Sequence, residues 1–282
     1  MLTHPLIRTF ARKIRNITYR AIDLFLPSVT NRNYLGFKLF YSSGNGLVER
    51  LRFLSPKKTY EPELGKIIID ELEKKPEGTF VDIGSNIGLI SLYVHKFSPR
   101  TKIVCFEPGQ LQRALFELTI AFNNLSSNIQ SLPYAIAEKN YLGIFSSNSN
   151  HAANSGDGLL NTNRTLTPTN QVSVDIRTLD GLVSYYQFQP SVIKIDIEGA
   201  ELLALKGMVD TLKKFRPVVF FEMNPQNLAV YPYEATDIIS FFHQNNYKIK
   251  NLDGEICSSA TYANLAKTDD MFIAEPTNDD NT

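Results

Sequence analysis

The amino-acid sequence predicts an α/β fold, namely a doubly wound and mainly parallel sheet with helices on both faces. From residue 80 onward, apolar strand-like runs alternate with segments whose apolar residues repeat at helical spacing, and such alternation is typical of parallel sheets. The first strand, 80–83, breaks into the glycine turn 84–88, and a helical pattern follows at once. This arrangement brings bare backbone N–H groups up to a cofactor.

The expected elements follow in order along one domain, 60–276. Pro62 opens a first helix, because proline is favoured in a first helical turn. The apolar runs then predict strands over 80–83, 102–106, 129–136, 192–197 and 217–222. Apolar residues at spacings of three and four predict helices over 87–97, 110–123, 200–214 and 234–245. Two last strands, 247–251 and 270–275, are expected to form an antiparallel pair, and the tail 277–282 is expected to fray.

Bulk composition narrows the classes of protein. The chain has 282 residues, of which 43% are hydrophobic and 21% charged, which is ordinary for a globular protein with a sizeable core. Its formal net charge is zero, so no nucleic-acid partner is expected. Two cysteines exclude a disulfide framework. A cytoplasmic protein is therefore expected.

The N-terminal residues carry an unusual charge. Residues 1–26 hold five basic residues against one acidic residue, and their apolar residues repeat at spacings of three and four. The pattern predicts a basic amphipathic helix within an extension, 1–30, followed by an accessory hairpin and linker, 31–59. One hypothesis is peripheral attachment to an anionic membrane surface or a partner helix. The other is a lid that packs on the chain's own domain.

The spelling of the glycine turn indicates which cofactor it takes. A dinucleotide fingerprint needs glycines where this chain has Asn86 and Leu89, so a pyrophosphate would meet side chains. The observed spelling suits a smaller zwitterionic ligand with an acid near its ammonium group, which is S-adenosylmethionine. The residues predicted to bind it are those of the strand end and turn, Asp82, Gly84, Ser85, Asn86 and Gly88.

Two further strand ends are expected to complete this cofactor site. Glu107, followed by Pro108, ends the second strand 23 residues after Gly84, close to the spacing at which an acid binds ribose hydroxyls. The third strand ends at Ala135 and Ile136, which are small and apolar and could form a wall against an adenine ring.

The remaining strand ends carry acids that predict the chemistry. Asp196 and Glu198 follow the fourth strand and Glu222 ends the fifth. Residues two apart on a strand share a face, so Asp196 and Glu198 are expected to converge. Such a group needs a cationic cofactor, a divalent metal such as magnesium, or one acid with a raised pKa. Alternatively, Glu198 only favours the dipole of the next helix.

These three acids are the predicted catalytic residues. Asp196 is the first candidate for a general base, Glu222 the second, and His151 in the polar segment 145–170 an outside candidate. In a metal-assisted variant, Asp196, Glu198 and Glu222 would be the ligands of magnesium. The residues alone do not decide between these mechanisms.

Taken together, the motifs resemble the FkbM family of S-adenosylmethionine-dependent methyltransferases. The resemblance covers roughly residues 60–224, and the block Asp196-Ile-Glu-Gly-Ala-Glu201 is its most specific part. It implies a seven-stranded class I methyltransferase sheet with a reversed last strand. It also implies methyl transfer to a hydroxyl of a sugar, glycan or natural product. Ser85 departs from the more usual alanine, and the insert 145–170 is expected to shape the acceptor pocket.

Two rival functions remain open at this stage. A nicotinamide-dependent oxidoreductase could use the same kind of sheet, and it would bind NAD rather than S-adenosylhomocysteine. A non-catalytic protein that docks a membrane or partner through residues 1–26 would bind neither ligand. The sequence gives neither the identity of the acceptor nor the oligomeric state.

Overall fold

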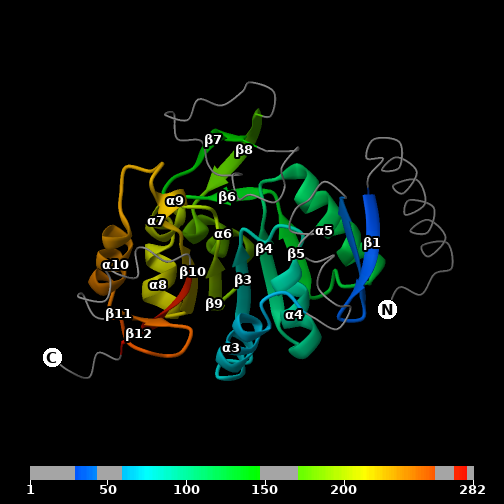
Figure 1. The fold of residues 1–282 in the computed structure, drawn as a ribbon, viewed down its shortest axis with the longest axis horizontal. Coiled ribbons are helices and arrows are strands. Elements are labelled where there is room, and N and C mark those ends of the chain that lie inside the picture. Colours follow the sequence, from blue (N-terminus) through cyan, green and yellow to red (C-terminus); the bar gives the residue numbers. More distant parts are fainter. Residues whose placement is uncertain (1–28, 43–58, 147–170, 258–269, 278–282) are drawn as a thin grey trace.

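The computed structural model describes residues 29–42, 59–146, 171–257 and 270–277 (Figure 1). The predictions for the helix in 1–30, for His151 and most of the segment 145–170, and for nearly all of the tail lie outside these ranges. Among the residues that the structure describes, no helix combines the length and hydrophobicity that a membrane span requires.

A seven-stranded sheet forms the centre of the fold, in the order β11-β12-β10-β9-β3-β4-β5. Its strands are β3 (Thr79–Ile83), β4 (Lys102–Phe106), β5 (Ile129–Leu132), β9 (Pro190–Ile195), β10 (Val218–Met223), β11 (Tyr247–Asn251) and β12 (Asp270–Pro276). β12 runs antiparallel to both of its neighbours, whereas the pairs of β3, β4, β5, β9 and β10 are all parallel. The expected class I sheet with a reversed last strand is therefore confirmed.

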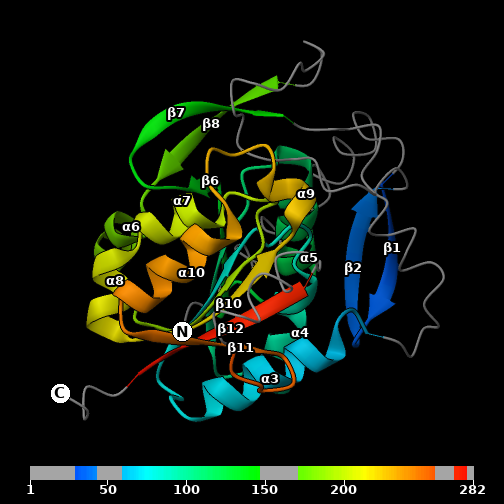
Figure 2. The ribbon, with the colours of Figure 1, turned by 60° about the vertical axis from the view of Figure 1, so that its left-hand side comes forward.

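Helices cover both faces of this sheet, as Figure 2 shows. One face carries α3 (Pro62–Glu73), α4 (Leu89–Phe97) and α5 (Gln110–Phe122). The other carries α6 (Leu179–Tyr186), α7 (Glu201–Lys206), α8 (Val209–Phe215) and α10 (Ala235–Gln244), while the short α9 (Pro225–Leu228) follows β10. Alternate strand residues feed the two cores: Val81 and Ile83 pack on one side and Phe80 on the other. The double winding follows from this two-sided burial.

The strand order reverses beside β3, and this places the site. The chain runs from β3 outward through β4 to β5, and then returns to lay β9 on the other side of β3. Ligands of doubly wound sheets bind outside the carboxyl ends of the strands at such a switch point. The site is therefore expected at the residues that follow β3 and β9.

The expected strand 129–136 is instead two strands in different sheets. β5 ends at Leu132, and after Pro133 the chain forms β6 (Tyr134–Ile136). β6 joins a separate three-stranded sheet, in the order β6-β8-β7, with β7 (Tyr141–Ser146) and β8 (Gln171–Arg177). Proline lacks the N–H that a continuous ladder would need, which accounts for the break.

The expected helix 200–214 is likewise divided into α7 and α8 at Gly207. A Cβ on Gly207 would lie 2.1 Å from the carbonyl oxygen of Ala137, so only glycine fits this close approach. The Asp180 carboxylate then accepts hydrogen bonds from the backbone N–H groups of Asp210 and Thr211, at 3.1 and 2.7 Å. This side chain caps the new helix, as an acid at a helix N-terminus does.

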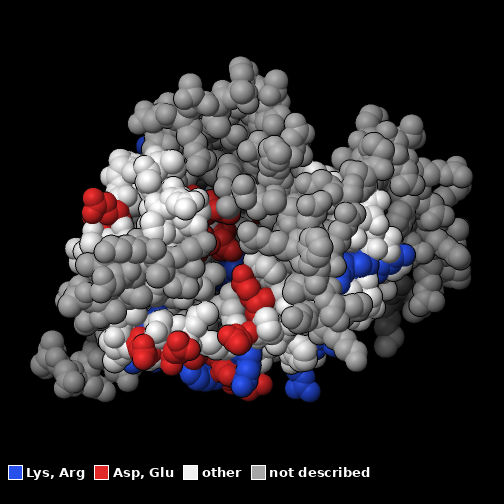
Figure 3. Space-filling model, in the orientation of Figure 1, with Lys and Arg blue, Asp and Glu red and all other residues white. Residues whose placement is uncertain are grey.

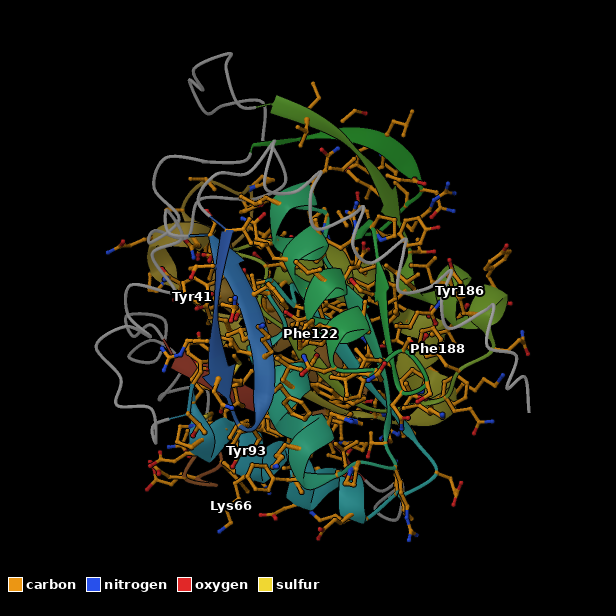
Figure 4. The ribbon with its side chains drawn as sticks, turned by 90° about the vertical axis from the view of Figure 1, so that its right-hand side faces the viewer. Tyr41, Lys66, Tyr93, Phe122, Tyr186 and Phe188 are labelled. Atoms are coloured by element: carbon orange, nitrogen blue, oxygen red, sulfur yellow. The ribbon has the colours of Figure 1, made fainter. Side chains whose placement is uncertain are left out.

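A hairpin of β1 (Val29–Tyr34) and β2 (Phe37–Ser42) packs beside α5, and it begins before the range 31–59 that was predicted for an accessory hairpin and linker. The Phe40 N–H donates to the Thr119 hydroxyl at 3.0 Å, and the Lys38 N–H donates to the Asn123 side chain at 2.9 Å. Figure 4 shows Tyr41 on this hairpin and Phe122 on the neighbouring helix. Polar side chains of α5 and of Asn123, the residue that follows it, thus satisfy backbone groups of β2.

Candidate active site

The glycine turn begins with Gly84, which is locked against the neighbouring strand. Its φ is +79°, and a Cβ there would lie 1.9 Å from the carbonyl oxygen of Asp196. Its N–H donates to the Phe106 carbonyl at 2.9 Å. The space that a side chain at Gly84 would need is filled by the Asp196 backbone. Glycine is needed here to let the ends of β3 and β9 approach each other.

The rest of the turn exposes the start of α4. Asn86 has a φ of +50° and Gly88 of +81°, and no side chain caps the first turn of the helix. A Cβ on Gly88 would lie 2.0 Å from the Phe116 ring, so the turn packs closely on α5. Because the first N–H groups of a helix lack intrahelical partners, this end of α4 suits a polar or anionic ligand group.

Glu107 joins this turn directly. The Asn86 N–H donates to its Oε2 at 2.9 Å and the Gly109 N–H donates to its Oε1 at 2.7 Å. The side chain is buried, since the residue is 7% exposed. The two places that the sequence predicts to hold the cofactor therefore lie side by side on adjacent strands. A carboxylate at this place is the kind of acceptor that binds a pair of ribose hydroxyls.

Two polar atoms at the turn are buried without a partner in the described residues. They are the Ser85 Oγ and the Asn86 Oδ1. Buried polar atoms are normally hydrogen-bonded, and exceptions call for an absent ligand or water. Together with Glu107, these atoms fit a polar cofactor that carries hydroxyl and amino groups, as S-adenosylmethionine does.

A buried lysine lies between the acids of β3 and β9. The Lys194 Nζ is 3.0 Å from the Asp196 Oδ2 and 3.7 Å from the Asp82 Oδ1. Both Lys194 and Asp82 are almost fully buried, whereas the Asp196 side chain is 26% exposed. The Ser91 hydroxyl donates to the Asp82 Oδ2 at 2.6 Å. Asp196 is thus the outward-facing member of a chain of charges that runs into the core.

Together, the neighbouring carboxylates change the pKa of Lys194 more than its burial does. Burial alone would lower its pKa, but Asp196, Asp82 and Glu61 raise it well above the usual value. Burial in turn raises the pKa of Asp82, against the opposing effects of Lys194 and Ser91. Figure 3 shows acidic side chains grouped near the centre of one face, close to a basic one, where β3 ends in Figure 1.

Sequence reasoning did not single out Lys194. We expected a bound cofactor, a metal or a raised pKa to offset the acids, and the chain itself supplies a cation. The signal was present, because Lys194 is a charge within the apolar run of β9. Its pairing in register with Asp82 becomes visible only when β9 lies beside β3.

Glu198 does not follow the geometry expected of it. β9 ends at Ile195, and Glu198 has a φ of +60°, so the period-two argument for convergence with Asp196 does not apply. The Asn227 side chain instead donates to the Glu198 Oε2 at 2.5 Å, and Asn227 itself lies in α9. Glu198 therefore links the loop after β9 to the segment after β10.

Glu222 lies next to Asp196 at the sheet edge. Phe221 and Ile195 are register partners in the parallel pair of β10 and β9, so the residues that follow them are neighbours. On its other side, Glu222 pairs with Met271 of β12. This placement agrees with the predicted row of acids at the carboxyl ends, and the catalytic roles remain predictions.

Ala135 and Ile136 are both buried, but in the small sheet beyond the end of β5. Ala135 packs with Ala137, Val174 and Ile176, whereas Ile136 belongs to a main core. Pro108 is half-buried directly after Glu107. The adenine wall and the contact of Pro108 with the cofactor stay predictions.

Metal binding receives no support from the described ranges. Within them, no group of three or more His, Cys, Asp and Glu side chains is arranged to hold a metal ion. One of the three acids predicted as magnesium ligands, Glu198, is engaged by Asn227.

Glu201 is a buried acid that fastens the loop after β9. Its Oε1 accepts hydrogen bonds from the N–H groups of Ile197 and Gly199, both at 3.2 Å. Its Oε2 has no partner among the described residues. Burial raises the pKa of Glu201 to about 7, although the backbone donors oppose the shift.

A pH-dependent loss of stability is expected from Glu201. Between its ordinary pKa of 4.5 and about 7 the unfolded chain releases this proton while the folded chain retains it. The free energy of unfolding therefore falls as the pH rises through this window, by about 3 kcal/mol from this group alone. Urea denaturation of wild type and Glu201→Gln at pH 4.5 and 7.5 measures it. Relative to wild type, the free energy of unfolding of Glu201→Gln should be higher at pH 7.5 than at pH 4.5 by that amount. Glu73→Gln, on the exposed end of α3, should show no such change. An equal difference at both pH values would refute the shift.

Comparison with known proteins supports the same assignment. The family model of the methyltransferase FkbM domain matches residues 82–249. "Methyltransferase 1" of Beauveria bassiana is 21% identical over 192 residues, which cover 58% of this chain and 77% of that protein. The hexuronic acid methyltransferase AglP of Haloferax volcanii is 26% identical over 183 residues, or 64% of this chain and 68% of that protein.

Among solved structures, the FkbM methyltransferase of Methylobacillus flagellatus is similar with a TM-score of 0.45 and 16% identity. The match covers 70% of this chain and 43% of that structure, so the chain spans less than half of the length of that protein. The family model matches more than half of the chain, and it begins at Asp82 and includes Glu107, Asp196 and Glu222. The chain therefore belongs to the FkbM methyltransferase family.

Proposed function

We propose that this chain binds S-adenosylmethionine at the turn 84–88 and transfers its methyl group to a hydroxyl oxygen of a sugar, glycan or natural product. The observation that carries the proposal is the contact between the Asn86 N–H and the Glu107 carboxylate, at 2.9 Å. It unites the two elements that would hold the amino-acid and ribose parts of the cofactor. Family membership supports methyl transfer over the oxidoreductase alternative.

The reaction needs a positioned acceptor oxygen and the removal of its proton. Bound S-adenosylmethionine would supply a methyl group already activated on sulfur. The protein must then hold the acceptor oxygen in line with the methyl carbon, and such positioning contributes up to about 7–11 kcal/mol. Asp196 is the proposed base: Lys194 holds its Oδ2, and no described residue hydrogen-bonds its Oδ1. Proton removal by a positioned base contributes roughly 100- to 10,000-fold.

The charge of the site favours a hydroxyl over a carboxylate acceptor. Glu61, Asp82 and Asp196 surround one buried cation, Lys194. A carboxylate acceptor would add another negative charge beside Asp196, whereas a hydroxyl adds none and benefits from a base. The relative whose name specifies a hexuronic acid supports a sugar acceptor, and such a sugar offers hydroxyl as well as carboxyl oxygens.

Calorimetric titration of the purified chain tests the proposal. S-Adenosylmethionine and S-adenosylhomocysteine should each bind with a stoichiometry of one, and NAD should give no binding heat. Binding of NAD alone would favour the oxidoreductase alternative. If none of the three ligands bound, the non-catalytic alternative would be favoured. Incubation with methyl-labelled cofactor and a cell extract, followed by mass spectrometry, then identifies the acceptor.

A further inference from the structure

The acids around Lys194 outnumber it. We call Glu61, Asp82, Lys194 and Asp196 the strand-end cluster. Three carboxylates act on the single ammonium group, which gives a formal charge of −2 when all are ionised. Burial raises the pKa of Asp82 and of Glu61, and if one of these two acids keeps its proton, one negative charge remains unbalanced. Within the described residues, no second Lys or Arg is paired with these acids.

The unbalanced charge faces the place where a ligand would bind. Lys194 and Asp82 are buried at 4% and 1% side-chain exposure, whereas Asp196 is at 26%. Asp196 is also the residue whose backbone touches Gly84, the first glycine of the cofactor turn. Charges in such a partly buried setting are weakly screened, so their effect on a nearby ligand charge is larger than in water.

We infer that the strand-end cluster distinguishes the sulfonium cofactor from its thioether product, with Asp196 as the residue that determines this selectivity. The inference rests on the proposed function. S-Adenosylmethionine and S-adenosylhomocysteine differ only by a methyl group and the positive charge on sulfur. A site with a net negative charge binds the sulfonium more favourably than the thioether. Loss of this charge on methyl transfer weakens the hold on the product and promotes its release.

The inference is tested by the ratio of the affinity for S-adenosylmethionine to the affinity for S-adenosylhomocysteine. We compare S-adenosylmethionine, S-adenosylhomocysteine and sinefungin, a stable analogue with an ammonium group near the sulfonium position, by calorimetry. Asp196→Asn keeps the shape of the side chain and removes its charge. It should leave the affinity for S-adenosylhomocysteine nearly unchanged and lower the affinity for the two cationic ligands by roughly 5- to 20-fold.

Two further variants provide a second test and a control. Glu61→Gln removes a charge that acts on Lys194 from the start of α3, and it should lower the same ratio. Glu73→Gln is the matched control, because Glu73 is exposed and lies at the other end of α3, about 18 Å away for a twelve-residue helix. It removes the same charge from the chain and should leave the ratio unchanged.

The outcomes separate this inference from the proposed function. If Asp196→Asn and Glu61→Gln weaken all three ligands equally, the cluster only shapes the site, and the inference is overturned while the function stands. A fall of the ratio in Glu73→Gln as large as in Asp196→Asn would overturn it as well, because net charge alone would then explain the effect. Failure of the wild-type chain to bind any of the three ligands would overturn the proposed function and this inference together.

Discussion

Replacement of Gly84 by alanine is expected to destabilise the fold by about 3 kcal/mol or more. The residue has a φ of +79°, and the new Cβ would lie 1.9 Å from the Asp196 carbonyl oxygen. That oxygen cannot move away cheaply, because the Asp196 N–H is bonded to the Ile83 carbonyl at 3.1 Å. Urea denaturation measures the loss, and the ends of β3 and β9 must separate for the variant to fold.

Gly254→Ala is the matched control for this prediction. Gly254 has a similar φ, +86°, but nothing lies within 4 Å of the position that its Cβ would take. It should therefore show only the cost of a left-handed alanine, about 1–2 kcal/mol. The difference between the two variants isolates the collision with Asp196. Equal losses of stability in Gly84→Ala and Gly254→Ala would show that β3 and β9 do not approach each other as closely as described.

Replacement of Glu107 by alanine should lower the affinity for S-adenosylhomocysteine by about 1–3 kcal/mol, or roughly 5- to 150-fold. The carboxylate is the proposed acceptor for the ribose hydroxyls, and it also holds the turn through the Asn86 N–H. Calorimetric titration gives the affinity directly. The loss should fall on all cofactor analogues alike, because they share the ribose.

Glu107→Gln should rescue little of this loss. Both carboxylate oxygens accept hydrogen bonds from backbone N–H groups, of Asn86 and Gly109. A glutamine amide would place a donor against one of these donors. Glu117→Gln, on the exposed side of α5 and 53% exposed at its side chain, should leave the affinity unchanged. If Glu107→Ala bound S-adenosylhomocysteine with full affinity, the proposed contact between Glu107 and the ribose would be wrong.

The central sheet and the proximity of the turn 84–88 to Glu107 could be predicted from the sequence, because both depend on local patterns. A strand that ends in a glycine turn places that turn at a carboxyl end wherever the strand lies. Glu107, one residue past a neighbouring strand, must then lie at the same edge. The contact between Asn86 and Glu107 follows from these two facts.

The remaining features depend on pairs that are distant in the sequence. Gly84 is required by the carbonyl of Asp196, and Gly207 by that of Ala137, and neither approach leaves a local signal. The pairing of Lys194 with Asp82 needs the return of the chain to the other side of β3.

α6 was not predicted, although Thr178 accepts a hydrogen bond from the Gly181 N–H as an N-cap. That signal was available and could have located the helix.

A crystal structure of the complex with S-adenosylhomocysteine tests the central claim most directly. The account predicts the ribose hydroxyls within hydrogen-bonding distance of the Glu107 carboxylate, and the amino-acid part beside the turn from Gly84 to Gly88. A ligand bound elsewhere on the sheet, or one whose ribose lies away from Glu107, would contradict it.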